Sequence, residues 1–220
     1  QALADAGAPR GVLTMVSHEH QDGNDLVNDD RIEAVAFTGS QRGGLALAKL
    51  AAERPRPIPF YGELGSINPV FVTPEAAAEH GAAIAAGWVG SFTLGAGQFC
   101  TKPGLLVAPH HKGIRAEAIA AVGGVPAQGM LTESIREAFL HGVSERIDMA
   151  SVEVLHGGGW DAETDTVHAT LFAVPASEVI ATPELLEECF GPMSLLVEYD
   201  DPKQMLELAD VLPGLLAAGV

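Results

Sequence analysis

The chain has 220 residues, with 12 basic and 29 acidic side chains, so its formal net charge is −17. Hydrophobic residues make up 47% and charged residues 19%, which excludes a disordered acidic tail, because disorder combines low hydrophobicity with high charge. The acidity argues against nucleic acid as a partner, and there is no run of about 18 apolar residues to span a membrane.

Short apolar runs alternate with longer amphipathic or alanine-rich stretches along the chain. A helix tail ending at Gly7 comes first, and the polar segment 17–30 has helix potential near its centre. The apolar runs predict strands at 12–16, 34–38, 60–61, 70–72, 105–107, 167–174 and 194–199. The longer stretches predict helices at 41–53, from Pro74 onward, and at 112–122, 132–147, 183–188 and 203–211. Such alternation is typical of an α/β fold with a largely parallel sheet.

Proline and cysteine usage indicate how the chain is organised. The proline-rich stretch 55–59 is a stiff connection, and by composition it is the best position for a domain boundary. The two cysteines are too few for a disulfide framework, which predicts a reduced, cytoplasmic setting.

A strand, a turn and a helix are expected around Phe37-Thr38-Gly39-Ser40. Glycine permits a sharp turn that exposes N–H groups at a helix N-terminus, where an anion is stabilised. Ser40 can cap that helix or donate to a phosphate oxygen. Because the full GxGxxG pattern is absent, an ordinary structural turn is the alternative.

Cys100 follows two glycines in Gly95-Ala96-Gly97-Gln98-Phe99-Cys100. Glycines beside a thiol allow a substrate to approach the sulfur and free backbone N–H groups to stabilise an oxyanion. A thiolate is a strong nucleophile. The alternative is a small buried hydrophobic residue, and no Cys-His arrangement indicates a papain-type hydrolase.

Two acidic residues stand in distinctive surroundings. Glu63 lies in an otherwise apolar, glycine-containing stretch, where partial burial would suit it to general-base catalysis; a helix or turn cap is the alternative. Glu188 and Phe190 precede Gly191-Pro192 and are suited to binding a ribose and supporting a flat ring, unless they simply end a helix.

The order of four motifs resembles that of the aldehyde dehydrogenase superfamily: FTGS, GELGSINP, GQFCT and EECFGP. The segments around Glu63 and Cys100 are most similar to the branch that oxidises 2-oxoglutarate semialdehyde. The resemblance implies an aldehyde dehydrogenase-like α/β fold. It also implies NAD or NADP as cofactor, a small aldehyde as substrate and a homo-oligomer for the full-length protein.

The resemblance implies a role for each motif. Cys100 is the nucleophile that forms a thioester, and Glu63 activates the water that releases the acid. Cys189 is expected only to pack. The residues expected to bind the cofactor come from three of the motifs and from the helix at 41–53. They are Thr38, Gly39, Ser40, Gly44, Leu64, Glu188 and Phe190.

By the same resemblance, residues 1–64 are the last part of a Rossmann-type cofactor domain and residues 65–220 are most of the catalytic domain. The upstream oxyanion-hole asparagine and the terminal oligomerisation arm of the family are not found, so a fragment is expected. Two alternatives stay open: a catalytically silent fragment, and a cofactor-independent thiol esterase.

Other polar residues suggest further functions. Lys102 is a cation two residues beyond Cys100, which suits a substrate carboxylate; an exposed lysine without a role is the alternative. His18-Glu19-His20 and His110-His111 offer metal ligands, but a site needs three or four that converge, so no metal is predicted.

Overall fold

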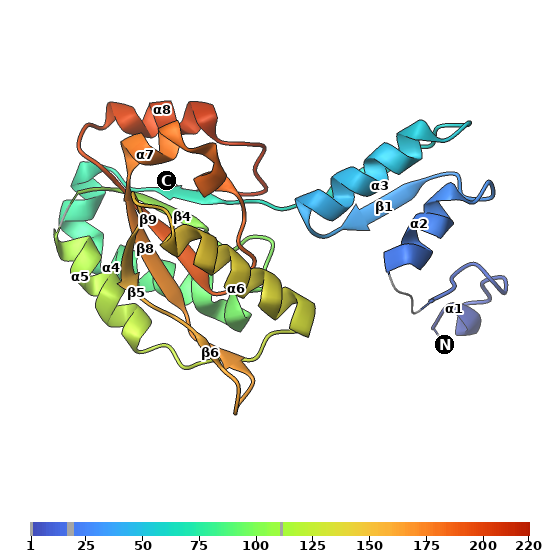
Figure 1. The fold of residues 1–220 in the computed structure, drawn as a ribbon, viewed down its shortest axis with the longest axis horizontal. Helices are drawn as coiled ribbons and strands as arrows, with labels where there is room; N and C mark the ends of the chain where they lie inside the picture. The colour runs from blue at the N-terminus through green and yellow to red at the C-terminus, as the bar shows by residue number, and fades with distance from the viewer. Residues whose placement is uncertain (1, 17–19, 111) are drawn as a thin grey trace. The chain divides into compact units, whose positions relative to one another are not determined.

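The computed structural model describes residues 2–16, 20–110 and 112–220 (Figure 1). The chain forms two compact units, Gln1–Gly65 and Ser66–Val220. The proline-rich stretch 55–59 lies inside the first unit, so the composition alone placed the boundary wrongly.

The first unit contains a strand–helix–strand motif. Strands β1 (Val35–Thr38) and β2 (Phe60–Glu63) are parallel, and α3 (Gln41–Glu53) connects them, as the sequence predicted. Helices α1 (Ala2–Asp5) and α2 (His20–Asn28) precede the motif. The buried Arg54 ties α2 to the end of α3 through bonds to the carbonyls of Val27, Asp29 and Ile32.

One expectation for the first unit was wrong. Within the residues that the structure describes, 12–16 form no strand, and their apolar side chains are exposed, Met15 by 94%. An apolar run becomes a buried strand only when a neighbouring strand and a covering layer are available. In α3 Leu45 is exposed, while Leu47 and Leu50 are half-buried and Ala51 is buried.

The second unit is built on a five-stranded sheet of order β3-β4-β9-β8-β5. The first four strands are mutually parallel, and β5 joins β8 antiparallel. The bounds of these strands are β3 Pro69–Phe71, β4 Leu105–Pro109, β5 Glu153–His156, β8 Thr170–Pro175 and β9 Met193–Tyr199. The prediction of an α/β fold with a largely parallel sheet is therefore confirmed.

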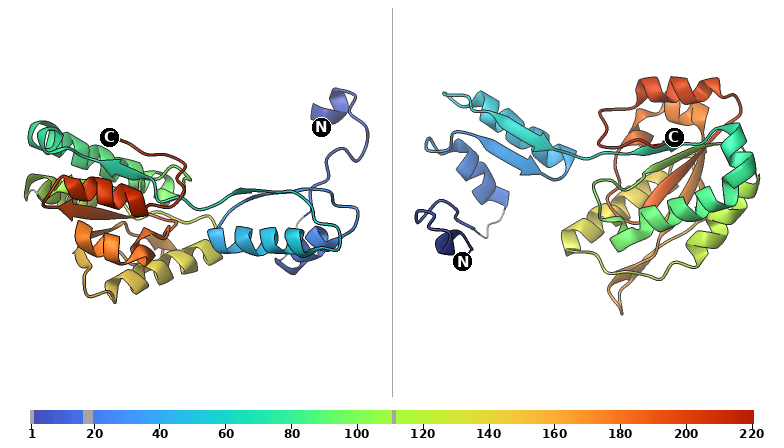
Figure 2. Two further views of the ribbon diagram at one scale, coloured as in Figure 1. Left: turned by 90° about the horizontal axis from the view of Figure 1, so that it is seen from above. Right: turned by 180° about the vertical axis from the view of Figure 1, so that it is seen from behind.

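Helices cover both faces of this sheet (Figure 2, left). In β4, Leu106 and Ala108 belong to the core cluster with α4 and α5, whereas Leu105 and Val107 belong to the cluster with α6, α7 and α8. A strand buried on both sides needs apolar residues at every position, which explains the unbroken apolar runs. The helices are α4 Pro74–Thr93, α5 Lys112–Gly123, α6 Glu133–Ile147, α7 Ala176–Ala181 and α8 Lys203–Val211, with 3-10 turns at Leu94–Gly97 and Pro183–Leu186.

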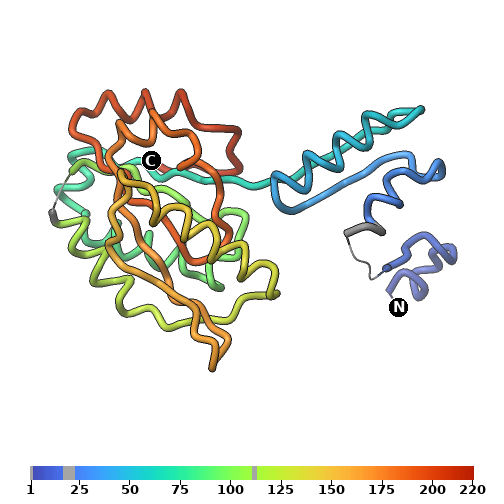
Figure 3. Tube along the Cα trace, in the orientation of Figure 1, coloured from blue at the N-terminus to red at the C-terminus, as the bar shows by residue number. Residues whose placement is uncertain are grey.

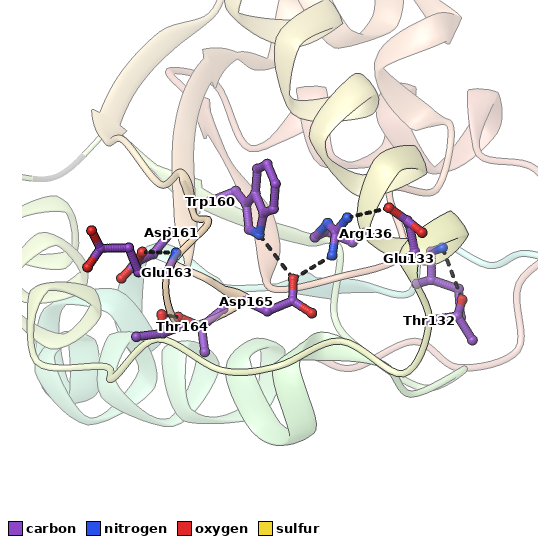
Figure 4. A network of polar contacts seen from close by, with 10 residues as sticks. Thr132, Glu133, Arg136, Trp160, Asp161, Glu163, Thr164 and Asp165 are labelled. Atoms are coloured by element: carbon purple, nitrogen blue, oxygen red, sulfur yellow. Dashed lines mark hydrogen bonds and ion pairs between the residues drawn. The ribbon is translucent and has the colours of Figure 1, made fainter.

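The segment 167–174, expected to be one strand, divides in two. Thr166–Val167 (β7) pairs antiparallel with Trp160–Asp161 (β6), and β8 begins at Thr170. Arg136 of α6 holds this hairpin: its guanidinium lies 4.5 Å from the Trp160 ring centroid and also contacts Asp165 (Figure 4). The glycine-rich stretch before Trp160 leads into this hairpin.

The chain returns to the sheet at its C-terminal end, where Gly219 exchanges hydrogen bonds with Pro69 and Phe71 of β3 (Figure 3). Trp88 of α4 is 4% exposed and belongs to the core. No helix among the described residues is both long and apolar enough to cross a membrane.

Candidate active site

The first group of candidate residues lies where β1 and β2 of the first unit end. Thr38 is the register partner of Glu63, and the Gly39 N–H donates to the Glu63 carbonyl at 3.1 Å. Ser40 caps α3, its Oγ accepting from the Gly43 N–H at 3.2 Å. The turn that presents a helix N-terminus and the candidate general base are therefore side by side at the carboxyl edge of two parallel strands, where ligands of α/β proteins commonly bind.

Gly44 and Leu64 form the packing contact beneath this edge. A Cβ at Gly44 would lie 2.0 Å from Leu64 Cδ2, so the missing side chain lets α3 lie close to the end of β2. Glu63 itself is exposed in the first unit, which corrects the expectation of partial burial. The carboxylate is accessible to water, as activation of a water molecule requires.

The second group begins at the end of α4, where the chain turns through left-handed conformations at Gly95, Ala96 and Gly97. Such a conformation is strained for alanine. Here the N–H of Ala96 donates to Oε1 of Gln128, whose amide nitrogen donates back to the Thr93 carbonyl. The loop that follows leaves the Cys100 thiol exposed, which excludes the buried hydrophobic alternative.

Asn68 holds the Cys100 loop from below, and sequence reasoning missed it. Its amide nitrogen donates to the carbonyls of Cys100 at 2.8 Å and Lys102 at 3.0 Å. Its Oδ1 accepts from the hydroxyl of the buried Ser66 at 2.6 Å. Asn68 has a φ of 47°, a conformation that asparagine tolerates better than most residues, and this preference was the available signal.

Glu188 and Phe190 lie in the segment Glu187–Met193, and both side chains are half-buried. Burial raises the pKa of Glu188, while Lys102 and a hydrogen bond from the Ser66 N–H act in the opposite direction. The segment touches the Cys100 loop: a Cβ at Gly97 would lie 2.2 Å from the Gly191 carbonyl oxygen. The second unit therefore brings the thiol loop and the Glu188–Phe190 pair together.

Lys102 differs from both sequence interpretations. It is 3% exposed, so the exposed-lysine interpretation is wrong. Its ammonium donates to the carbonyls of Cys189 at 2.8 Å and Met193 at 2.9 Å. Because these bonds direct the charge into the protein, the geometry gives no support to a contact with a substrate carboxylate.

The second thiol, Cys189, is buried in the core against α6, with Sγ 3.7 Å from the Phe139 carbonyl. Burial raises its pKa, which keeps the thiol protonated and unreactive. No group of three or more His, Cys, Asp and Glu gathers for a metal among the described residues. His18, Glu19 and His111 lie outside them.

The chain belongs to the aldehyde dehydrogenase family, whose model matches residues 1–220. Alpha-ketoglutaric semialdehyde dehydrogenase 2 of Azospirillum brasilense is 40% identical, with 99% of this chain and 42% of that protein covered. Alpha-ketoglutaric semialdehyde dehydrogenase of Acinetobacter baylyi is 34% identical, with coverage of 100% and 42%. The resemblance drawn from the four motifs is confirmed, and the chain spans about two-fifths of these relatives.

Solved structures show the same fold at lower identity. An NAD-dependent benzaldehyde dehydrogenase from Corynebacterium glutamicum has a TM-score of 0.77 at 24% identity, covering 98% of this chain and 48% of that one. Aldehyde dehydrogenase C from Pseudomonas syringae, crystallised with NAD+ and octanal, has a TM-score of 0.79 at 22% identity, covering 94% and 44%. At these identities the likeness concerns the fold alone.

Proposed function

We propose that this chain carries the catalytic thiol and water-activating carboxylate of an aldehyde dehydrogenase that oxidises 2-oxoglutarate semialdehyde to 2-oxoglutarate with NAD or NADP. The observation that supports it most is the contact between the loop of the exposed Cys100 and the segment of Glu188 and Phe190. The 40% identity to an alpha-ketoglutaric semialdehyde dehydrogenase supports the substrate.

The residues present fit a nicotinamide dinucleotide. The N-terminus of α3, with Thr38, Gly39 and Ser40 at its turn, suits a pyrophosphate, because its N–H groups and dipole favour an anion. In the second unit, the half-buried carboxylate of Glu188 suits a ribose hydroxyl and the Phe190 ring suits a flat base. When bound, the oxidised nicotinamide supplies the acceptor for a hydride.

The chemistry of the chain's own residues follows. The Cys100 thiolate adds to the aldehyde carbon and forms a thiohemiacetal, and the same carbon, after losing its hydride, remains as a thioester. Glu63 takes a proton from water, the hydroxide attacks the thioester carbon, and the bond from that carbon to Sγ breaks, so that the acid leaves and the Cys100 thiolate is restored. The proton on Glu63 then passes to solvent. Asn68 fixes the loop through the Cys100 carbonyl, so the nucleophile is preorganised.

A second candidate is cofactor-independent thiol esterase activity. The exposure of Cys100 favours it, because an ester can reach the thiol directly. Ester hydrolysis needs no nucleotide. We further propose a homo-oligomer and, from cysteine usage, a cytoplasmic setting. The choice between NAD and NADP is open to direct comparison in the same assay.

The test compares Cys100→Ser with Cys189→Ala, the matched control at the buried thiol. In the complete gene product, Cys100→Ser is expected to lower dehydrogenase turnover by at least roughly 10³-fold, since the covalent route is lost. Cys189→Ala is expected to remain within a few-fold of the wild type. Iodoacetamide followed by peptide mass spectrometry is expected to label Cys100 and spare Cys189.

Glu63→Gln separates the two chemical steps. Acylation is expected to proceed, giving a burst of one NAD(P)H per active site, whereas later turnover falls roughly 10²- to 10⁴-fold without the general base. Stopped-flow absorbance measures both phases. An unreactive Cys100 would indicate a non-enzymatic protein, and hydrolysis of a nitrophenyl ester without any aldehyde oxidation would favour the esterase.

A further inference from the structure

Two buried cations hold the Glu187–Met193 segment by its main chain. Lys102 donates to the carbonyls of Cys189 and Met193. Arg146 of α6, 5% exposed, donates to the Glu187 carbonyl at 2.6 Å and to Gly142 of its own helix. A buried charge is costly unless hydrogen bonds satisfy it, so a lysine that merely filled space would be replaced at lower cost by an apolar residue.

Lys102 also belongs to the Cys100 loop, two residues after Cys100. Its own carbonyl accepts from the amide of Asn68, which holds the Cys100 carbonyl as well. The main chain of Lys102 is therefore fixed with the thiol loop, while its side chain is fixed to the segment that carries Glu188 and Phe190. One residue connects two parts of the molecule that are 87 and 91 positions apart in the sequence.

The other contacts of the Glu187–Met193 segment do not fix the shape of its main chain as Lys102 does. Gly191 packs against Phe139 on the α6 side and against Gly97 on the loop side, and Glu188 accepts from the Ser66 N–H. These contacts fix individual points of the segment. The two bonds of Lys102 span Cys189 to Met193, so they fix the curvature of the chain on which Phe190 stands.

We propose that Lys102 is a positioning residue that sets Glu188 and Phe190 relative to the Cys100 loop and thereby orients the cofactor for hydride transfer. It acts through the two carbonyls and does not touch the substrate. The inference rests on the proposed dehydrogenase function. It assigns to Lys102 an inward-facing role in place of the substrate contact suggested by the sequence.

The test, made in the complete gene product, compares Lys102→Met with Lys203→Met, the matched control at an exposed lysine of α8. Dehydrogenase turnover at saturating cofactor is expected to fall roughly 10- to 100-fold, because small displacements of positioned groups cost that much. Hydrolysis of a nitrophenyl ester without cofactor, which needs Cys100 and Glu63 but neither Glu188 nor Phe190, is expected to stay within about twofold. A general loss of folding would lower both activities together.

Hydrogen exchange gives a readout that does not depend on the dehydrogenase. Faster amide exchange within 187–193 is expected in Lys102→Met and not in Lys203→Met. In a folded Lys102→Met variant, an equal loss of both activities, or unchanged exchange and turnover, would overturn the proposal. If Lys102→Met does not fold, Lys102→Gln, which keeps one amide donor, is expected to show the same split to a smaller extent. A wild type without aldehyde oxidation contradicts the proposed function instead, and exchange still tests Lys102.

Discussion

The two groups of candidate residues are held in place by different means. In the first unit, the turn at Ser40 depends on near neighbours: Ser40 caps a backbone three residues away, and Gly39 bonds across adjacent strands. In the second unit, the Cys100 loop and the Glu187–Met193 segment depend on buried contacts between residues about 90 positions apart. The first arrangement is local and exposed, and the second is distant and buried.

The difference determines how each group responds to change. A hydrogen bond at an exposed turn competes with water, so its removal costs little. The polar contacts of the second unit lie out of water, where an unpaired carbonyl or ammonium is expensive and neighbouring bonds reinforce one another. We therefore expect a single substitution in the second unit to disrupt the Cys100 loop and the Glu187–Met193 segment together. A single substitution at the Ser40 turn is expected to lower the stability of the first unit only slightly.

Gly97→Ala is expected to have the largest effect, because it tests the close contact between the Cys100 loop and the Glu187–Met193 segment. The new Cβ would lie 2.2 Å from the backbone carbonyl oxygen of Gly191, and Gly97 has a φ of 64°, which alanine adopts with strain. Because a backbone cannot rotate away as a side chain does, the two segments must separate. The free energy of unfolding of the second unit is expected to fall by roughly 2–5 kcal/mol, measured by urea denaturation.

Gly90→Ala is the matched control, because Gly90 lies in the same unit on an exposed part of α4 with nothing within 4 Å of its Cβ position. A helix interior favours alanine over glycine by about 0.5–1 kcal/mol, so this variant is expected to be more stable. If both variants changed stability alike, the close approach of the two segments would be refuted.

Local patterns in the sequence predicted most of the fold. The helices at Gln41–Glu53 and Lys203–Val211 have the expected bounds, since capping and apolar spacing are properties of neighbouring residues. The strand expected at 12–16 failed for the opposite reason. Hydrophobicity shows that a segment can be buried, but only the rest of the molecule provides a partner.

The candidate site divides along the same line. The proximity of Thr38 and Glu63 follows from two parallel strands that end together, which a strand–helix–strand pattern implies. The bonds of Lys102, Asn68 and Arg146 to distant carbonyls leave no pattern in the sequence, because a carbonyl belongs to every residue alike. Their functions emerge only when the folded backbone is known.

Substitutions at Ser40 test the exposed turn of the first unit, where a smaller loss of stability is expected. Ser40→Ala removes the cap of α3 and is expected to cost about 1 kcal/mol in the stability of the first unit. Ser40→Asp keeps an oxygen that accepts from the Gly43 N–H, so stability is expected to be retained. If the turn holds a pyrophosphate, the added charge weakens cofactor binding by about 1 kcal/mol, or about fivefold in Kd. Calorimetric titration with NAD and NADP measures it, and unchanged Kd in Ser40→Asp would place the pyrophosphate elsewhere.

Glu188 gives the smallest effect, a change in the pH dependence of stability in the second unit. Burial raises the pKa of Glu188 above its ordinary value of 4.5, against the opposing action of Lys102 and the Ser66 N–H. Between 4.5 and the raised pKa, the native state holds a proton that the unfolded state has released, so stability falls as pH rises through this window. Glu188→Gln removes this titration, so the free energy of unfolding, measured by urea denaturation, is expected to fall less steeply as the pH rises. Glu187→Gln, at the adjacent exposed carboxyl, is the matched control. An equal change of slope in both variants would mean that the burial of Glu188, and with it the tight fit of its segment, has no energetic consequence.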